Sequence, residues 1–313
     1  MTTLGVAVIG AGFWGRNQIR VFSEIPDCLL VAVCDTDKEA LRRVAEEHHV
    51  AACSSLDDVL RREDVDAVTV CTPTTTHYEI AQKVIEAGKH VLVEKPLTST
   101  LQEAQRIIAL AQRNNVFLSV GFIERFNPAV RYLKDVIDQN KVGRVILIIA
   151  RRVTRWPERV GDIGVTKDSA IHDVDVMRFL LNSEVSHVYA TAGSLKHRLE
   201  DFSEIMLTFE NGVAGFIDAN WLTPRKIRSL VVTGSEATAV IDYLTQEVTI
   251  EESSKSTRPR LQWEEPLRLE LQNFIQSIIS GRQPSPSGLD GLRALEVCEA
   301  ALQSSKEKRV MEL

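Results

Sequence analysis

A glycine-rich turn near the start of the chain constrains its fold more than any other feature. Residues 10–15 read Gly-Ala-Gly-Phe-Trp-Gly, directly after the apolar run at 6–9 and at the start of an amphipathic segment. Between a strand and a helix, this pattern is typical of a turn that binds the phosphates of a dinucleotide. A purely structural glycine turn is the alternative. The expected members of the cofactor turn are Gly10, Gly12, Phe13, Trp14 and Gly15.

The first 121 residues alternate short apolar runs with amphipathic segments, which indicates a parallel sheet with crossover helices. The runs are nearly continuous rather than alternating, so both faces of each strand are expected to be buried. We therefore predict an α/β domain at 1–121, with a doubly wound parallel sheet. The expected strands are 6–9, 29–34, 67–71, 90–93 and 117–120, and the expected helices are 15–24, 38–48, 55–61, 76–87 and 100–114.

The remainder of the chain, 122–313, has a different pattern. A helical segment at 128–140 is followed by a long strand at 144–153, a helix at 167–181 and a run of strands joined by hairpin signals. This order predicts an α+β domain with an open, mainly antiparallel sheet. The later strands are expected at 185–196, 202–210, 213–221, 227–233, 237–243 and 246–251, and two closing helices at 266–280 and 289–305.

Asp35 indicates which dinucleotide the turn binds. It ends the second expected strand, 20 residues after Gly15, where an acid that binds the adenosine ribose is expected. Its negative charge would repel the 2′-phosphate of NADP, and neither Thr36 nor Asp37 supplies a positive charge to offset it. The sequence therefore predicts NAD as the cofactor. A helix N-cap role for Asp35 or Asp37 is compatible with this interpretation.

Charge and cysteine content exclude several classes of partner. The formal net charge is −6 over 313 residues, so no basic field for a nucleic acid is expected. No apolar run approaches the roughly 20 residues of a membrane helix. The five cysteines form no Cys-x-x-Cys pair, and no His stands at metal-ligand spacing, so we expect no metal site, no disulfide framework and a cytoplasmic location.

Two loops are expected at the carboxyl ends of the third and fourth strands recognised in the sequence, where ligands of open α/β sheets bind. The first contains Thr72, Pro73 and His77, and the second is Glu94-Lys95-Pro96. A surface salt bridge is the default interpretation of a Lys beside a Glu. Their position instead predicts that both loops face the nicotinamide half of the cofactor.

A third constellation lies in the segment 168–175. On a regular α-helix Asp168, His172 and Asp175 stand at i, i+4 and i+7 and share one face. Histidine is suited to proton transfer near neutral pH, and a neighbouring carboxylate can orient the imidazole. An N-cap followed by a solvated helix face is the alternative.

Taken in order along nearly the whole chain, these motifs resemble the Gfo/Idh/MocA oxidoreductase family. The resemblance implies an N-terminal Rossmann domain for NAD(P) and a C-terminal α+β domain for a sugar, cyclitol or related substrate. It also implies that Lys95 and His172 are the catalytic groups. Asp168 would orient the imidazole, while either Lys95 or His172 could take the proton.

Residues 121–128, Arg151-Arg152-Val153 and 162–165 are similar to those of members that oxidise the C3 hydroxyl of UDP-N-acetylglucosamine. This finer resemblance implies a nucleotide-sugar substrate, and those members often carry Leu or Gly where this chain has Ser169-Ala170. The alternatives are an inositol or free-sugar dehydrogenase, the reverse reduction of a 3-keto sugar, and a non-catalytic NAD-sensing scaffold. Alternating apolar positions in the second sheet favour a homodimer or homotetramer. The candidate substrate contacts are Lys95, Arg125, Asn127, Arg151, Arg152, Asp168, His172 and Asp175.

Overall fold

A computed structural model describes residues 3–157 and 161–313, and these fall into two compact units. The first contains Met1–Phe122 and Leu267–Leu292, and the second contains Ile123–Pro266 and Arg293–Leu313. The helical segment Leu267–Leu292, which the sequence pattern placed with the second part, thus counts with the first unit. The predicted domain limits, 1–121 and 122–313, stay a prediction.

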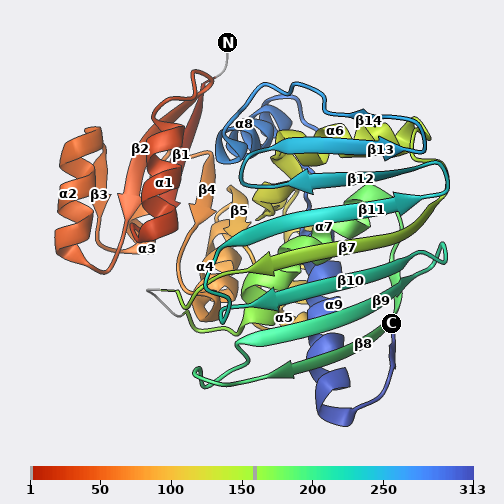
Figure 1. Cartoon of the computed structure of the whole chain (residues 1–313). Coiled ribbons are helices and arrows are strands. Elements are labelled where there is room, and N and C mark those ends of the chain that lie inside the picture. The colour runs from red at the N-terminus through yellow and green to blue at the C-terminus, as the bar shows by residue number, and fades with distance from the viewer. Residues whose placement is uncertain (1–2, 158–160) are drawn as a thin grey trace. The chain divides into compact units, whose positions relative to one another are not determined.

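The first unit is built on a six-stranded parallel sheet in the order β3-β2-β1-β4-β5-β6 (Figure 1). All residues of β1 and β4 are buried, as their continuous apolar sequences predict. The strands are β1 Leu4–Ile9, β2 Cys28–Cys34, β3 Ala51–Cys53, β4 Ala67–Val70, β5 His90–Glu94 and β6 Leu118–Gly121. The helices are α1 Phe13–Phe22, α2 Lys38–His48, α3 Leu56–Leu60, α4 Thr74–Glu86, α5 Leu101–Arg113 and α8 Pro266–Ile279.

The strand order of this sheet positions the cofactor turn. Chain connections run one way from β1 through β2 to β3 and the other way from β4 through β5 to β6, so the order reverses between β1 and β4. Ligands of open α/β sheets bind outside the carboxyl ends of the strands at this reversal. The turn at 10–15 follows β1, and the loops at Thr72 and Lys95 follow β4 and β5.

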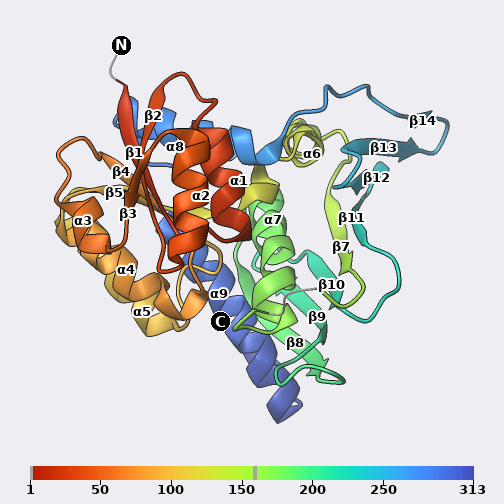
Figure 2. The same ribbon diagram turned by 90° about the vertical axis from the view of Figure 1, so that its left-hand side faces the viewer.

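The second unit is built on a nine-stranded sheet in the order β14-β13-β12-β11-β7-β10-β9-β8-β15. All its pairs are antiparallel except β7 with β10. Helices α6 and α7 contact one face of this sheet (Figure 2). Its elements are η1 Ile123–Phe126, α6 Pro128–Asp138, β7 Val145–Val153, η2 Thr166–Ala170, α7 Ile171–Leu181, β8 Val185–Gly193, β9 Phe202–Phe209, β10 Ala214–Asn220, β11 Ile227–Gly234, β12 Ala237–Asp242, β13 Glu247–Glu252, β14 Ser256–Thr257, α9 Gly288–Glu307 and β15 Met311–Glu312.

The predicted fold class is confirmed: a doubly wound parallel sheet precedes a unit with an open, mainly antiparallel sheet. The sequence pattern missed the short strands β3, β14 and β15. It also treated 167–181 as one regular helix, whereas η2 is a π-helix that leads into α7. Among the described residues, none of the helices combines the length and apolarity that crossing a membrane requires.

Candidate functional site

The glycine turn leaves space only where a ligand would need it. Gly10 has a φ of +97°, and a Cβ built there would lie 2.7 Å from the carbonyl oxygen of Cys71. A Cβ on Gly15 would lie 1.7 Å from the carbonyl oxygen of Gly10. A Cβ on Gly12, by contrast, would meet no atom within 4 Å. Packing therefore requires a glycine at both Gly10 and Gly15, whereas Gly12 borders open space.

The start of α1 suits the pyrophosphate of a dinucleotide. Its N-cap is Gly12, no side chain caps the helix, and its first turn contains no acidic residue. The first backbone N–H groups of a helix lack partners within the helix and carry a partial positive charge, so they attract a phosphate. Phe13 and Trp14, in this first turn, expose 62% and 40% of their surfaces and pack edge to face. The residues present therefore fit NAD.

Asp35 is tied to the same turn. One carboxylate oxygen accepts a hydrogen bond from the backbone N–H of Ala11 at 2.5 Å, and the other accepts from Asp37 N–H at 2.8 Å. Asp35 is half-buried, at the end of β2. Asp37, not Asp35, is the N-cap of α2. Asp35 thus holds the glycine turn in place, and the ribose contact stays a prediction.

Lys95 directly follows β5, and the preceding residue is anchored. Glu94 is buried and accepts a hydrogen bond of 2.7 Å from Gln18 of α1. Burial raises the pKa of the Glu94 carboxyl, while Lys95 and the Gln18 hydrogen bond oppose the rise. Gly121 leaves room for this carboxyl, because a Cβ there would lie 2.9 Å from Oε2 of Glu94. Glu94 therefore fixes the backbone from which Lys95 extends.

His77 joins the two loops that follow β4 and β5. Its side chain is buried, with Nδ1 2.9 Å from the carbonyl oxygen of Pro96 and Nε2 2.9 Å from that of Thr72. The hydroxyl of Thr76 donates to Thr72 in the same loop. Among the residues predicted from the sequence, the structure brings Thr72, Pro73, His77 and the Lys95 loop together. The geometry gives His77 a positioning role.

The histidine helix begins with an irregular turn. Asp168 lies in the π-helix η2, and His172 is the second residue of α7. The Ser169 hydroxyl donates to the Asp168 carboxylate at 3.3 Å and accepts a hydrogen bond of 3.4 Å from the indole of Trp221. π-Helical turns inside longer helices are frequent at functional sites. Ser169 thus contacts the predicted catalytic acid.

Asp175, the third acidic or imidazole residue predicted for that helix face, pairs with an arginine of η1. It is fully buried and forms a two-pronged ion pair with Arg125, at 2.7 Å to Nε and 2.6 Å to Nη2. Arg125 is itself 6% exposed and lies over the ring of Phe179. The pair connects η1 to α7, which gives both residues a structural role in the second unit. Their contacts with substrate stay a prediction.

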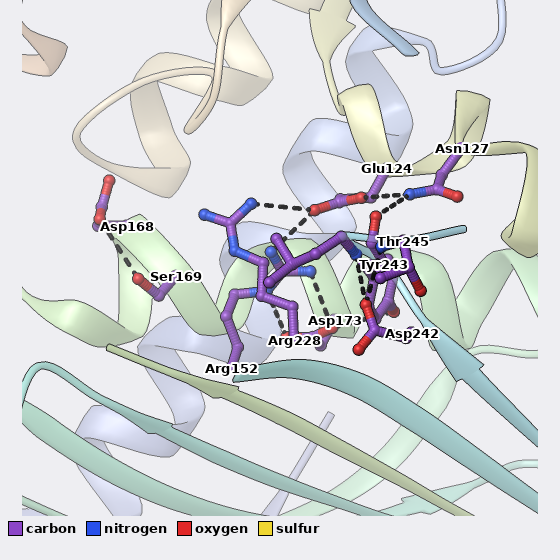
Figure 3. A network of polar contacts seen from close by, with 11 residues as sticks. Glu124, Asn127, Arg152, Asp168, Ser169, Asp173, Arg228, Asp242, Tyr243 and Thr245 are labelled. Carbon is purple, nitrogen blue, oxygen red and sulfur yellow. Dashed lines mark hydrogen bonds and ion pairs between the residues drawn. The ribbon is translucent and has the colours of Figure 1, made fainter. Parts of the chain in front are cut away.

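Arg152 is the centre of a buried polar network on the helix-covered face of the sheet (Figure 3). Its guanidinium donates to both oxygens of Asp173, at 2.7 and 3.2 Å, and to Oε1 of Glu124 at 2.9 Å. Tyr243 donates its hydroxyl to Asp173, and Arg228 reaches Glu124 at 3.4 Å. Arg152 is 4% exposed, so its role is to neutralise two buried carboxylates.

The two remaining predicted substrate contacts lie apart from each other. Asn127 is buried and caps α6, and its amide donates to the carbonyl oxygen of Tyr243 at 3.0 Å. Arg151 is exposed and pairs with Asp218 at 2.9 Å, on the face of the sheet opposite Arg152. Arg151 and Arg152 were both predicted to contact the substrate, but successive residues of a strand point to opposite faces.

Sequence reasoning missed four members of the Arg152 network: Glu124, Asp173, Arg228 and Tyr243. A signal for two of them was present. Arg228 shares its strand face with the buried Leu230 and Val232, by the two-residue period of a strand. Asp173 is buried in a helix that is largely buried. A charged residue at a position that pattern assigns to the interior is itself a sign of a polar network.

Two models of known protein families match the chain. A family model described as "Oxidoreductase family, NAD-binding Rossmann fold" matches residues 4–122, and the model of the GFO/IDH/MocA C-terminal domain matches residues 130–240. The chain belongs to the Gfo/Idh/MocA family. As a member of this family it is an NAD-dependent oxidoreductase with an N-terminal Rossmann fold, which confirms the predicted cofactor.

Relatives within the Gfo/Idh/MocA family match over nearly the full chain. The UDP-N-acetylglucosamine 3-dehydrogenase of Acidithiobacillus ferrooxidans is 30% identical, with 97% of this chain and 96% of the relative covered. The myo-inositol 2-dehydrogenase of Thermotoga maritima is 31% identical, with 98% of each covered. A solved structure of the Acidithiobacillus ferrooxidans enzyme has a TM-score of 0.91 at 28% identity and covers 98% of this chain and 99% of its own.

Proposed function

We propose that this Gfo/Idh/MocA protein oxidises a ring CH–OH group of a sugar, and that its substrate is UDP-N-acetylglucosamine, oxidised at C3 to the 3-keto sugar. The observation that carries the proposal is the full-length likeness to a UDP-N-acetylglucosamine 3-dehydrogenase, in sequence and in structure. The similar identity to an inositol dehydrogenase makes a cyclitol the alternative substrate.

The proposed chemistry assigns one role to each of three side chains. NAD, held at the glycine turn, would supply the acceptor for the hydride of the carbinol carbon. His172 takes the hydroxyl proton, because imidazole is suited to proton transfer near neutral pH. Lys95 stabilises the developing negative charge on the oxygen. Asp168 orients the imidazole and is itself positioned by Ser169. An exchange of roles between Lys95 and His172 would leave the overall reaction unchanged.

A substrate panel tests this proposal. With NAD in excess, we expect formation of NADH with UDP-N-acetylglucosamine at a kcat/KM at least tenfold above those for myo-inositol and free N-acetylglucosamine. Turnover confined to myo-inositol would replace the proposed substrate with a cyclitol. If NAD binds but neither the sugars, the cyclitols nor the reverse reaction with a 3-keto sugar shows turnover, the scaffold alternative is favoured instead.

We further infer that a second copy of the chain covers the sheet face opposite α6 and α7. Four large apolar side chains form a row in register across four adjacent strands, each at least 38% exposed: Ile149, Phe216, Met206 and Tyr189. A second row beside it contains Arg151, Asp218, Glu204 and Thr191. This row has both signs of charge and can therefore pair with itself across a two-fold axis.

The second row also stores electrostatic strain. Asp218 and Glu204 stand directly opposite each other in β10 and β9. Partial burial and the neighbouring Asp218 raise the pKa of Glu204 to about 7, and Arg151 opposes the rise. An arginine of a second copy would relieve this repulsion.

The five free thiols are also compatible with the cytoplasmic location that we propose.

Sedimentation of the wild-type protein and of Met206→Asp tests the interface. We expect a dimer or tetramer for the wild type and a shift toward monomer for the variant, because the new carboxylate would be desolvated in the contact. Leu244→Asp is the matched control, since Leu244 is 43% exposed in a turn outside the two rows. An unchanged mass for Met206→Asp would place the interface elsewhere.

A further inference from the structure

Two guanidinium groups stand side by side on the helix-covered face of the nine-stranded sheet. Arg228 of β11 is the direct antiparallel partner of Arg152 in β7. On the same face of β11, the following positions Leu230 and Val232 are fully buried. Like charges directly opposite each other in a sheet are destabilising. The position therefore requires a compensating negative charge.

The carboxylates of this network are committed mainly to Arg152. Arg152 takes both oxygens of Asp173 and approaches Oε1 of Glu124 at 2.9 Å. Arg228 reaches the same oxygen of Glu124 at 3.4 Å, and this is the one hydrogen bond that its guanidinium makes to the described part of the chain. The other oxygen of Glu124 faces the amide of Asn127 at 3.3 Å. An arginine has five N–H donors, so most of those of Arg228 remain available.

Lys226 adds a third cation next to Arg228. It precedes β11, is exposed, and forms no hydrogen bond or ion pair within residues 3–157 and 161–313. Arg228 is the main cause of a lowered pKa for the Lys226 amine. Burial, then Arg152, lowers the pKa of Arg228, while Glu124, Asp173 and, more weakly, Asp168 oppose this. The two side chains thus form a cationic pair that the protein neutralises only in part.

Arg228 belongs to the polar network that reaches the proposed catalytic helix. Arg152 holds Asp173, which is the residue after His172 in α7. Asp168, at the start of that helical segment, acts electrostatically on Arg228. The Arg228 side chain remains 37% exposed, so a ligand can reach it from solvent. Arg228 therefore combines available donors with access from solvent, and it lies in the same polar network as Asp173, the residue after His172 (Figure 3).

We propose that Arg228, assisted by Lys226, binds an anionic group of the substrate, either a phosphate or a carboxylate. This inference rests on the proposed function, because it assigns part of the sugar substrate to the second unit. A guanidinium recognises the oxygens of both anions through paired hydrogen bonds, and the nearby ammonium adds a point charge. The substrate class is then a nucleotide-linked sugar or a sugar acid, and a neutral cyclitol would make no use of the pair.

Steady-state kinetics of Arg228→Gln and Lys226→Gln test the assignment. For UDP-N-acetylglucosamine we expect kcat/KM to fall about 10- to 100-fold in Arg228→Gln, chiefly through KM, and several-fold in Lys226→Gln. Arg225→Gln is the matched control, since it removes the same charge from an exposed neighbour and should change kcat/KM less than about twofold. Thermal unfolding of each variant verifies that it is folded.

Three substrates separate the sources of the anion. Loss confined to UDP-N-acetylglucosamine indicates a diphosphate site, and loss confined to glucuronate indicates a carboxylate site. An equal loss with myo-inositol would overturn the inference, because a neutral substrate cannot report on an anion site. So would unchanged kinetics with both anionic substrates.

The inference can be decided even if UDP-N-acetylglucosamine is not the substrate. Inorganic phosphate is then tested as an inhibitor against whichever sugar or cyclitol the enzyme oxidises, with NAD saturating. Competition with the sugar that weakens at least tenfold in Arg228→Gln supports the site. Absence of competition, or equal competition in the wild type and the variant, would contradict it.

Discussion

Replacing His172 or Lys95 by alanine is expected to lower kcat by about 10²- to 10⁴-fold while leaving NAD binding within a few-fold of the wild type. A positioned general base contributes a factor of this size, and a donor aimed at a developing oxyanion contributes about 10²- to 10³-fold. The effect should fall on kcat rather than on KM, because both groups act on charge that develops in the transition state. Steady-state rates and a fluorescence titration of NAD measure the two quantities.

Matched substitutions distinguish this loss from a general effect of removing a side chain. Lys83 is exposed in α4, and His48 is half-exposed near the end of α2. Alanine at either position should leave kcat within about twofold of the wild type, as expected for surface substitutions. A rate close to wild type for Lys95→Ala or for His172→Ala would remove that residue from the proposed mechanism.

Substitution of Arg152 by methionine is expected to lower the free energy of unfolding of the second unit by about 3 to 5 kcal/mol. Methionine fills a similar volume but leaves the carboxylates of Asp173 and Glu124 without their main partner in a buried site. A loss of this size lowers the melting temperature by about 6 to 20 °C in a unit of this length. Denaturant unfolding followed by circular dichroism measures it.

An exposed arginine of the second unit, outside the two interface rows, supplies the control for this prediction. Arg309→Met removes the same charge, but its ion pair with Glu307 is exposed, with 61% of the arginine side chain accessible. Exposed ion pairs contribute about 0 to 1 kcal/mol, so the change should be small. Equal losses for the two variants would mean that burial of the network does not determine its contribution.

Local patterns in the sequence predicted much of the fold. Continuous apolar runs identified five of the six strands of the first unit, because a strand buried on both faces leaves a strong signal. The missed strand, Ala51–Cys53, has three residues, too few for a pattern. The glycine turn was predicted in detail, since Gly10 and Gly15 answer local steric requirements and Gly12 borders the open space that a ligand would need.

Contacts between distant residues could not be read in the same way. Arg125 and Asp175 are 50 residues apart, and Arg152 and Asp173 are 21 apart, and each pair depends on how η1, β7 and α7 pack. The π-helical turn at Thr166–Ala170 has no simple sequence signature, so the spacing argument for Asp168 and His172 assumed a regular helix. The partners of these side chains could therefore not be predicted from sequence spacing alone.

In the proposed reaction, hydride moves from C3 of a nucleotide sugar to NAD. UDP-N-acetylglucosamine that carries deuterium at C3 tests this transfer when the label is followed by mass spectrometry of the products. We expect the deuterium in the reduced cofactor and a 3-ketone as the sugar product. Reduced cofactor without deuterium, or no reaction with this substrate under conditions where a cyclitol is oxidised, would contradict it.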